Sequence, residues 1–273
     1  MSSPSVWLGP ARQPVRLLMI GFGAAALLLV GGLAFSNYFL GSDIGMHQML
    51  RPEGRLIVYL TLFAVFGAVF FASVYLSDTV GSIESEPSGF FDIISLVCSR
   101  IAMIMLPLIV IVMFYEVISR YVFSSGTLWA NEMSLWLAGF LFLLAGLYAM
   151  QQRSHIRIYI IYDMMPRWMQ KLSDCISVFL IWVFAFCLFW GGYSESKAKF
   201  MRMETFGTAW DPPIPATIKP MIIIIIIMVA IQALSNLIAD WNKAPEHHSP
   251  ADEIDETEIE NIRRTLEVSG EDK

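Results

Sequence analysis

Six long apolar blocks dominate this sequence and restrict what it can fold into. They lie at about 15–36, 56–76, 93–117, 131–150, 174–193 and 216–239. Each is close to the roughly 20 apolar residues that a helix needs to cross the hydrocarbon core of a bilayer. Backbone polar groups in lipid must be paired within the segment, so each block is predicted to be a helix. The sequence therefore predicts an all-α membrane protein with about six transmembrane helices.

The composition agrees with this prediction and excludes some functions. Of the 273 residues, 56% are hydrophobic and only 15% are charged. The net charge of −6 arises in the C-terminal stretch 240–273, which is rich in Asp and Glu. No basic face is present that could neutralise phosphates, so nucleic-acid binding is not expected. The three cysteines lie in apolar stretches without metal-ligand spacing and are interpreted as small buried hydrophobic residues.

Changes in composition divide the chain into four parts. Residues 1–80 form an extra helical pair, and 81–92 form an acidic linker. Residues 93–240 form a four-helix unit, and 241–273 form an acidic tail that is expected to be disordered.

The first block has two possible interpretations. It follows two arginines and ends near small residues, so a signal peptide cleaved near residue 36 is an alternative to a first span. The small residues around Gly21 and Gly23 suit a helix packed closely on a neighbour.

The loop charges predict an orientation. The stretch 151–171 contains the densest short group of basic residues, so it is placed in the cytoplasm. With six spans, both termini are then cytoplasmic as well. The basic residues that this orientation leaves on the outside oppose it: Arg51, Arg55, Lys197, Lys199, Arg202 and Lys219.

The chain lacks the signatures of an enzyme. No HExxH motif, phosphate-binding Gly-Lys-Ser/Thr loop or nucleophile elbow is present. The predicted spans offer almost no polar groups that could converge on a substrate or relay protons. Pro107 is expected to bend one helix. We therefore expect a partner subunit, neither an enzyme nor a pore.

Three stretches carry the most information at the ends of the spans. Glu116 and Arg120 are four residues apart and can pair across one helical turn. Trp129 and Glu132 open the next helix, where an acid favours the helix dipole and a tryptophan suits the membrane boundary. A third stretch, 151–164, contains His155 and Arg157 and has one apolar helical face, so it is predicted to be an amphipathic arm lying in the membrane interface.

These stretches resemble the small permease subunit of tripartite ATP-independent periplasmic (TRAP) transporters. Members show an Arg-Tyr-Val/Phe-Phe end to the first family helix, a Trp-x-Glu-Glu opening to the second, and then a Gly-His-Ile/Val-Arg-Val-Asp segment. The matching residues here are Arg120 to Phe123, Trp129, Glu132, His155, Ile156 and Arg157. Asn131, Ser154 and Tyr159 depart from these patterns. The resemblance covers about 90–240, and the first two helices are not part of the usual family pattern.

The resemblance implies a three-part system in a bacterial or archaeal cytoplasmic membrane. A periplasmic binding protein captures an organic acid, and a large multi-helix permease subunit moves it in a sodium-coupled step. The small subunit acts as a scaffold beside the large one, contacts membrane lipids and helps to dock the binding protein. It binds no cofactor itself, and the residues implied to form its interfaces are Glu116, Arg120, Trp129, Glu132, His155 and Arg157. An accessory subunit of another membrane complex, such as a respiratory one, is the alternative.

Overall fold

The computed structural model describes residues 5–81, 84–85, 87, 89–153, 162 and 164–242. Within these residues it contains six helices that are long and apolar enough to cross a membrane, and no strand. They are α1 (Arg12–Leu40), α3 (Leu56–Ser77), α4 (Phe90–Tyr121), α5 (Ala130–Gln151), α7 (Arg167–Met201) and α8 (Ile214–Asp240). Each contains one of the six predicted spans, so the predicted all-α membrane fold is confirmed. A short helix, α2 (Met46–Leu50), lies between α1 and α3.

Two of these helices are longer than a membrane crossing requires. At 1.5 Å per residue, the 32 residues of α4 and the 35 residues of α7 extend to about 48 and 52 Å, against a core of about 30 Å. The helix α4 begins at Phe90, three residues before its predicted start, directly after Gly89. Prolines lie inside two of the helices, Pro107 in α4 and Pro220 in α8.

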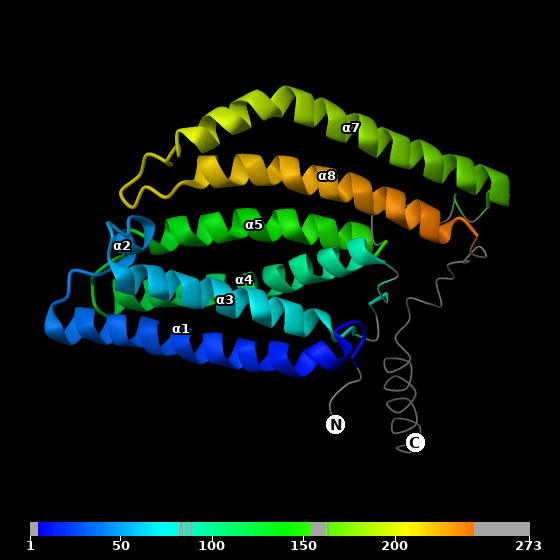
Figure 1. Cartoon of the computed structure of the whole chain (residues 1–273). Helices are drawn as coiled ribbons and strands as arrows, with labels where there is room; N and C mark the ends of the chain where they lie inside the picture. The colour runs from blue at the N-terminus through cyan, green and yellow to red at the C-terminus, as the bar shows by residue number, and fades with distance from the viewer. Residues whose placement is uncertain are drawn as a thin grey trace, which may run out of the picture.

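The helices lie side by side in the order α1, α3, α4, α5, α8 and α7 (Figure 1). The most enclosed apolar cluster lies where α4, α5 and α8 meet, and its buried members are Ala102, Leu144, Leu147 and Ile225. The outermost helices rest on one main neighbour each, α7 on α8 and α1 on α3. The hairpin of α1 and α3 joins the other four helices through α3 and α4.

Close packing in the α1–α3 hairpin depends on Gly67 and not on the glycines of α1. The Phe22 ring lies so near Gly67 that an added Cβ would be 2.4 Å from its Cδ1. The same ring stacks on Phe71 and meets Phe63 edge-on, with centroids 5.3 and 5.4 Å apart. An added Cβ at Gly21 or Gly23 would meet nothing within 4 Å, so these two glycines are not where α1 packs closely within this chain.

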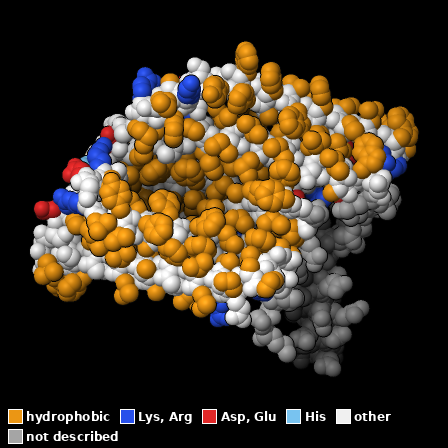
Figure 2. Space-filling model, in the orientation of Figure 1, with side chains coloured by type: hydrophobic (Ala, Val, Ile, Leu, Met, Phe, Trp, Pro, Cys, Tyr) orange, Lys and Arg blue, Asp and Glu red, His pale blue; other side chains and the backbone are white. Residues whose placement is uncertain are grey.

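The face drawn in Figure 2 is apolar over most of its length and carries its charged side chains mainly toward its ends and edges. The start of α1 and the end of α8 lie at the same end, as six antiparallel spans require (Figure 1). We call it the Asp78 end, and its described residues are 5–11, 78–81, 84–85, 87, 89, 151–153 and 240–242. The opposite end, formed by residues 41–55, 122–129 and 202–213, is called the Trp129 end.

The segment before α1 is tied to the end of α3. The carboxylate Oδ1 of Asp78 accepts hydrogen bonds from the backbone N–H groups of residues 6, 7 and 8, at 2.8 to 3.1 Å, and from the Ser5 hydroxyl. Its Oδ2 lies 3.3 Å from Nε of Arg12. Asp78 is fully buried, which is tolerable only because these donors replace its water. Cleavage near residue 36 would remove every one of these donors, because they all lie in residues 5–12.

Candidate functional site

At the Trp129 end, Glu116 organises the turn between α4 and α5. It forms the predicted pair with Arg120, whose Nε donates to Oε1 at 3.0 Å. Its other oxygen, Oε2, accepts from the backbone N–H of Thr127 at 2.9 Å and from the Thr127 hydroxyl. Glu116 is buried, whereas the Arg120 side chain is 58% exposed. The carboxylate therefore holds a loop backbone in place as well as pairing with Arg120.

Trp129 and Glu132 stand at the opening of α5, as predicted. The Trp129 ring stacks on Tyr115 of α4 with 5.8 Å between centroids. Glu132 lies in the first turn of α5, where a negative charge interacts favourably with the helix dipole. Its Oε2 atom is buried and has no hydrogen-bond partner within the described residues. A donor from outside the chain would lower the cost of burying this oxygen.

Three segments that are distant in sequence meet beside this turn. The Trp210 indole, in the α7–α8 connection, donates to the backbone oxygen of Met46 in α2 at 3.0 Å. The Trp136 indole donates to Thr217 at 2.8 Å and lies edge-on to Trp210. Around them is a groove of about 310 Å³, lined by Asn37, Asp43, Gly45, Met46, His47, Gln48, Leu128, Trp129, Ala209 and Trp210. The sequence did not reveal this meeting, because it depends on how α2 folds back over the bundle.

Several basic residues at the Trp129 end are neutralised by acids. Arg51, directly after α2, lies 3.1 Å from Asp211 in the α7–α8 connection. Lys199 pairs with Glu204, just beyond the end of α7, and Lys219 pairs with Glu195, within the last turns of α7.

Two predicted site residues, His155 and Arg157, lie outside the described residues, as does most of the predicted amphipathic arm. The residues beside that stretch are anchored. Arg153 pairs with Asp240 at the end of α8, with NH2 2.9 Å from Oδ1. The Tyr162 hydroxyl donates to Asp174 at 2.8 Å. Both flanks of the predicted arm are thus fixed at the same end of the bundle.

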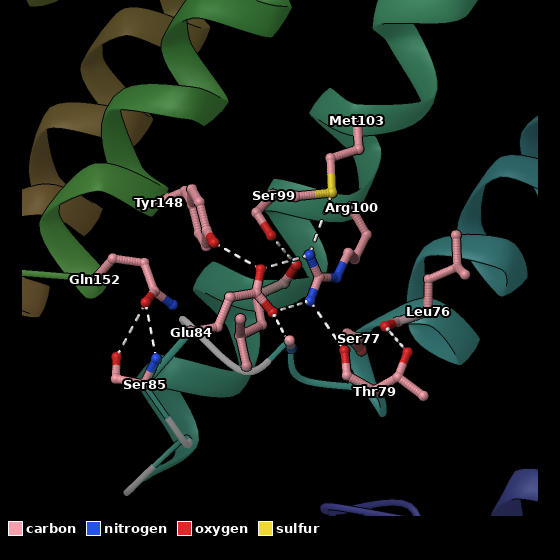
Figure 3. A network of polar contacts seen from close by, with 12 residues as sticks. Leu76, Ser77, Thr79, Glu84, Ser85, Ser99, Arg100, Met103, Tyr148 and Gln152 are labelled. Carbon is pink, nitrogen blue, oxygen red and sulfur yellow. Dashed lines mark hydrogen bonds and ion pairs between the residues drawn. The ribbon is translucent and has the colours of Figure 1, made fainter. Parts of the chain in front are cut away.

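The Asp78 end contains a polar network that sequence reasoning missed (Figure 3). Arg100, within the predicted span 93–117, is buried and pairs with Glu84 through two bonds of 2.8 and 2.6 Å. The Tyr148 hydroxyl donates to Oε1 of Glu84 at 2.6 Å, and the Gly81 N–H donates to Oε2 at 2.9 Å. The network joins the linker to α4 and α5. The expectation that the spans bring almost no polar groups together is therefore wrong at this end.

The surroundings of Glu84 favour its ionised form. The hydrogen bonds from Arg100 are the largest influence and lower the pKa of Glu84 to about 2, against the opposing effect of burial. The Tyr148 hydroxyl and the Gly81 N–H lower the pKa further. For Asp78, burial alone would raise the pKa, but the N–H groups of Leu8 and Trp7, the Ser5 hydroxyl and Arg12 together hold it below its usual value.

A second buried network joins α4 to α8. The Gln232 amide nitrogen donates to Asp92 at 2.5 Å, and its oxygen accepts from the Ser95 hydroxyl at 2.9 Å. Asn236, one turn further along α8, donates to the backbone oxygen of Met150 in α5 at 2.7 Å. These contacts fix the relative positions of three helices.

A signal for the first network was present in the sequence. A charged residue inside a span is costly and usually pairs, so Arg100 required an acidic partner, and the neighbouring linker is acidic. No comparable signal predicted Gln232 with Asp92, because amide side chains are common and their partners depend on helix rotation.

Comparison with known proteins gives one match. Residues 109–243 match the family model described as "Tripartite ATP-independent periplasmic transporters, DctQ component". The matched segment begins inside α4, includes α5, α7 and α8, and leaves α1–α3 outside it. No curated protein and no solved structure matches the chain.

Proposed function

Since residues 109–243 form a DctQ component unit of the TRAP transporters, we propose that this chain is a scaffold for the large permease subunit in sodium-coupled uptake of organic acids. It is a multi-pass membrane protein and the small membrane component of such a transporter. The observation that carries the proposal is the family match, which covers both predicted motifs within the described residues, at Glu116–Arg120 and Trp129–Glu132. In this proposal the large subunit binds the substrate and the coupling ion.

The distribution of polar groups supports a scaffold role. Arg100, Gln232 and Glu116 bond to neighbouring helices or to a loop, so most of their hydrogen bonds are made inside the chain. The groove at the Trp129 end lies toward one end of the bundle, and a second groove lies toward the other end, beside the C-terminus of α3. A carrier needs a polar site near the bilayer midplane, usually at broken helices.

The apolar surface supports a partner within the membrane. Only 6% of the most apolar 18-residue stretch of α7 is buried within the chain. None of the corresponding stretch of α1 is buried. Both helices therefore have wide faces available for lipid and for the large subunit.

We place the Asp78 end in the cytoplasm and the Trp129 end outside. The basic residues Arg153, Arg167 and Lys171 support this orientation, since short basic loops are retained in the cytoplasm. The groove beside Trp129 then faces the compartment of the binding protein and is the surface proposed to dock it. Reporter fusions after Lys171 and after Lys273 should both give cytoplasmic signals, and a periplasmic signal at either position would reverse the proposed topology.

The scaffold role predicts that this chain alone transports nothing. Liposomes containing only this chain should show no uptake of organic acids under a sodium gradient, whereas adding the large subunit and binding protein should restore uptake. Robust uptake by the chain alone would refute the proposal.

A co-purification experiment tests the interface residues. We expect Glu132→Gln and Arg157→Ala to reduce recovery of the large subunit, or to lower the unfolding temperature of the pair. Glu53→Gln is the matched control for Glu132, because Glu53 is an exposed glutamate at the same end. If both variants retain a fully stable complex but lose uptake, the residues act in transport or docking, and their scaffold role is wrong.

A further inference from the structure

A groove opens between the end of α3 and the first half of α4. It has a volume of about 380 Å³ and is lined by Leu76, Thr79, Val80, Gly81, Glu84, Arg100 and Met103. Leu76 and Met103 are 40% and 47% exposed, so the groove wall is accessible from the side of the bundle. The groove lies outside the segment that matches the family model.

One polar atom in this groove lacks a partner. Arg100 has five N–H donors, and four of them are accounted for by Glu84 (two), the Thr79 backbone oxygen at 3.0 Å and the Met103 sulfur at 3.2 Å. The fifth, on Nε, is buried and has no acceptor within the described residues, and Arg100 as a whole is only 7% exposed. In Figure 3 the Nε side of the guanidinium faces away from Glu84, toward the side where Leu76 lies. A buried donor without an acceptor costs about 1–3 kcal/mol.

The position of the groove along the helices indicates what meets it. The 22 residues of α3 extend to about 33 Å, close to the thickness of the hydrocarbon core. Leu76 is its penultimate residue, so the groove lies where hydrocarbon gives way to the polar region of the lipids. At that depth the neighbouring molecules present ester and phosphate oxygens above acyl chains.

We propose that this groove binds one phospholipid, with a headgroup or ester oxygen accepting the Nε–H of Arg100 and an acyl chain lying along Leu76 and Met103. The oxygen supplies the missing acceptor, and the chain covers the exposed apolar walls. This site does not depend on the transport function, so it can fail or hold independently of it.

The electrostatics of the site predict its selectivity. Arg100 is already neutralised by Glu84, and the nearby Asp78 is neutralised by Arg12. The groove therefore requires a hydrogen-bond acceptor and not an additional negative charge. Zwitterionic and anionic phospholipids with the same acyl chains should bind with similar affinity.

The full chain, purified and stripped of lipid, can be titrated with phosphatidylethanolamine and phosphatidylglycerol while native mass spectrometry counts bound lipids. We expect saturable binding of one lipid, with affinities for the two headgroups within about threefold of each other, and no displacement by inorganic phosphate. Leu76→Trp and Met103→Trp fill the groove from its two walls and should weaken binding about tenfold. Leu60→Trp is the matched control, because Leu60 is also exposed on α3 but lies 16 residues from Leu76.

The lipid-binding measurements distinguish a specific site from its absence. Weaker binding in either groove variant with unchanged binding in Leu60→Trp supports the site. The proposal is overturned if the unmodified chain shows no saturable lipid, if both groove variants bind as tightly as the unmodified chain, or if Leu60→Trp weakens binding equally. Displacement by inorganic phosphate, or a strong preference for the anionic lipid, also overturns it.

Discussion

Separating Arg100 from Glu84 should destabilise the protein more than any surface substitution. We consider Arg100→Met and Glu84→Gln, which keep similar side-chain volumes but remove the charge of one partner. The two side chains are only 8% and 14% exposed, so either single change leaves the other charge buried without its counter-ion. Breaking a buried ion pair in this way typically costs about 3–5 kcal/mol.

The lowered pKa of Glu84 gives a second value for the contribution of this ion pair to the free energy of unfolding. A shift from 4.5 to about 2 corresponds to about 3 kcal/mol in favour of the ionised form. Solvent near the mouth of the groove screens part of this, so about 2 kcal/mol is a reasonable lower figure. Because the folded-state pKa lies below the unfolded value, the stabilisation is complete above about pH 5 and is lost as the pH falls toward 2.

Thermal unfolding in detergent, monitored by tryptophan fluorescence between pH 3 and 8, measures these effects. Both single variants should unfold at lower temperature than the unmodified chain at neutral pH. Glu84→Gln should also remove the contribution of Glu84 to the fall in unfolding temperature below pH 5. The double variant should be more stable than the sum of the two single losses predicts, because neither charge is then left unpaired.

Strict additivity of the two single losses would refute this reasoning. So would a loss below about 1 kcal/mol for either single variant, since that is the range of an exposed surface pair.

Three further predictions concern the other contacts. Gly67→Ala should destabilise the α1–α3 hairpin by about 1–3 kcal/mol, because the new methyl group overlaps Phe22; Gly31→Ala, which meets nothing within 4 Å, should not lower the unfolding temperature. Asp78→Asn should lower the protection of the backbone amides of residues 6–8 against hydrogen exchange, measured relative to their intrinsic exchange rates. Acidification below the ordinary range of aspartate should do the same in the unmodified chain, because the pKa of Asp78 is lowered in the folded protein and the clamp is strongest when Asp78 is ionised. Glu116→Ala should increase exchange at the Thr127 amide without changing exchange in the middle of α5, and equal exchange in both proteins would contradict its role in the turn.

The pairing of Glu116 with Arg120 illustrates what local spacing can predict. Two residues four apart on a helix are neighbours by helix geometry alone, and the pair forms as expected. The additional bonds from Glu116 to Thr127 could not be inferred, because they depend on the path of the turn after α4. Ser124 lies within that turn with a positive φ of 51°, a conformation that its residue type does not predict.

The sequence by itself determined the number of spans, their approximate limits and their family relationship. The physical reason is that the bilayer imposes a fixed thickness and requires internal backbone pairing, so a long apolar block permits little other than a helix. Which helices touch was decided only in three dimensions. Lipid is as apolar as the helix surfaces, so burial does not select neighbours, and contacts such as Phe22 with Gly67 or Gln232 with Asp92 depend on helix rotation and side-chain fit. Arg100 belongs to both levels: its charge in a span demanded a partner, but only the fold placed it at a groove with its Nε buried and without an acceptor within the described residues.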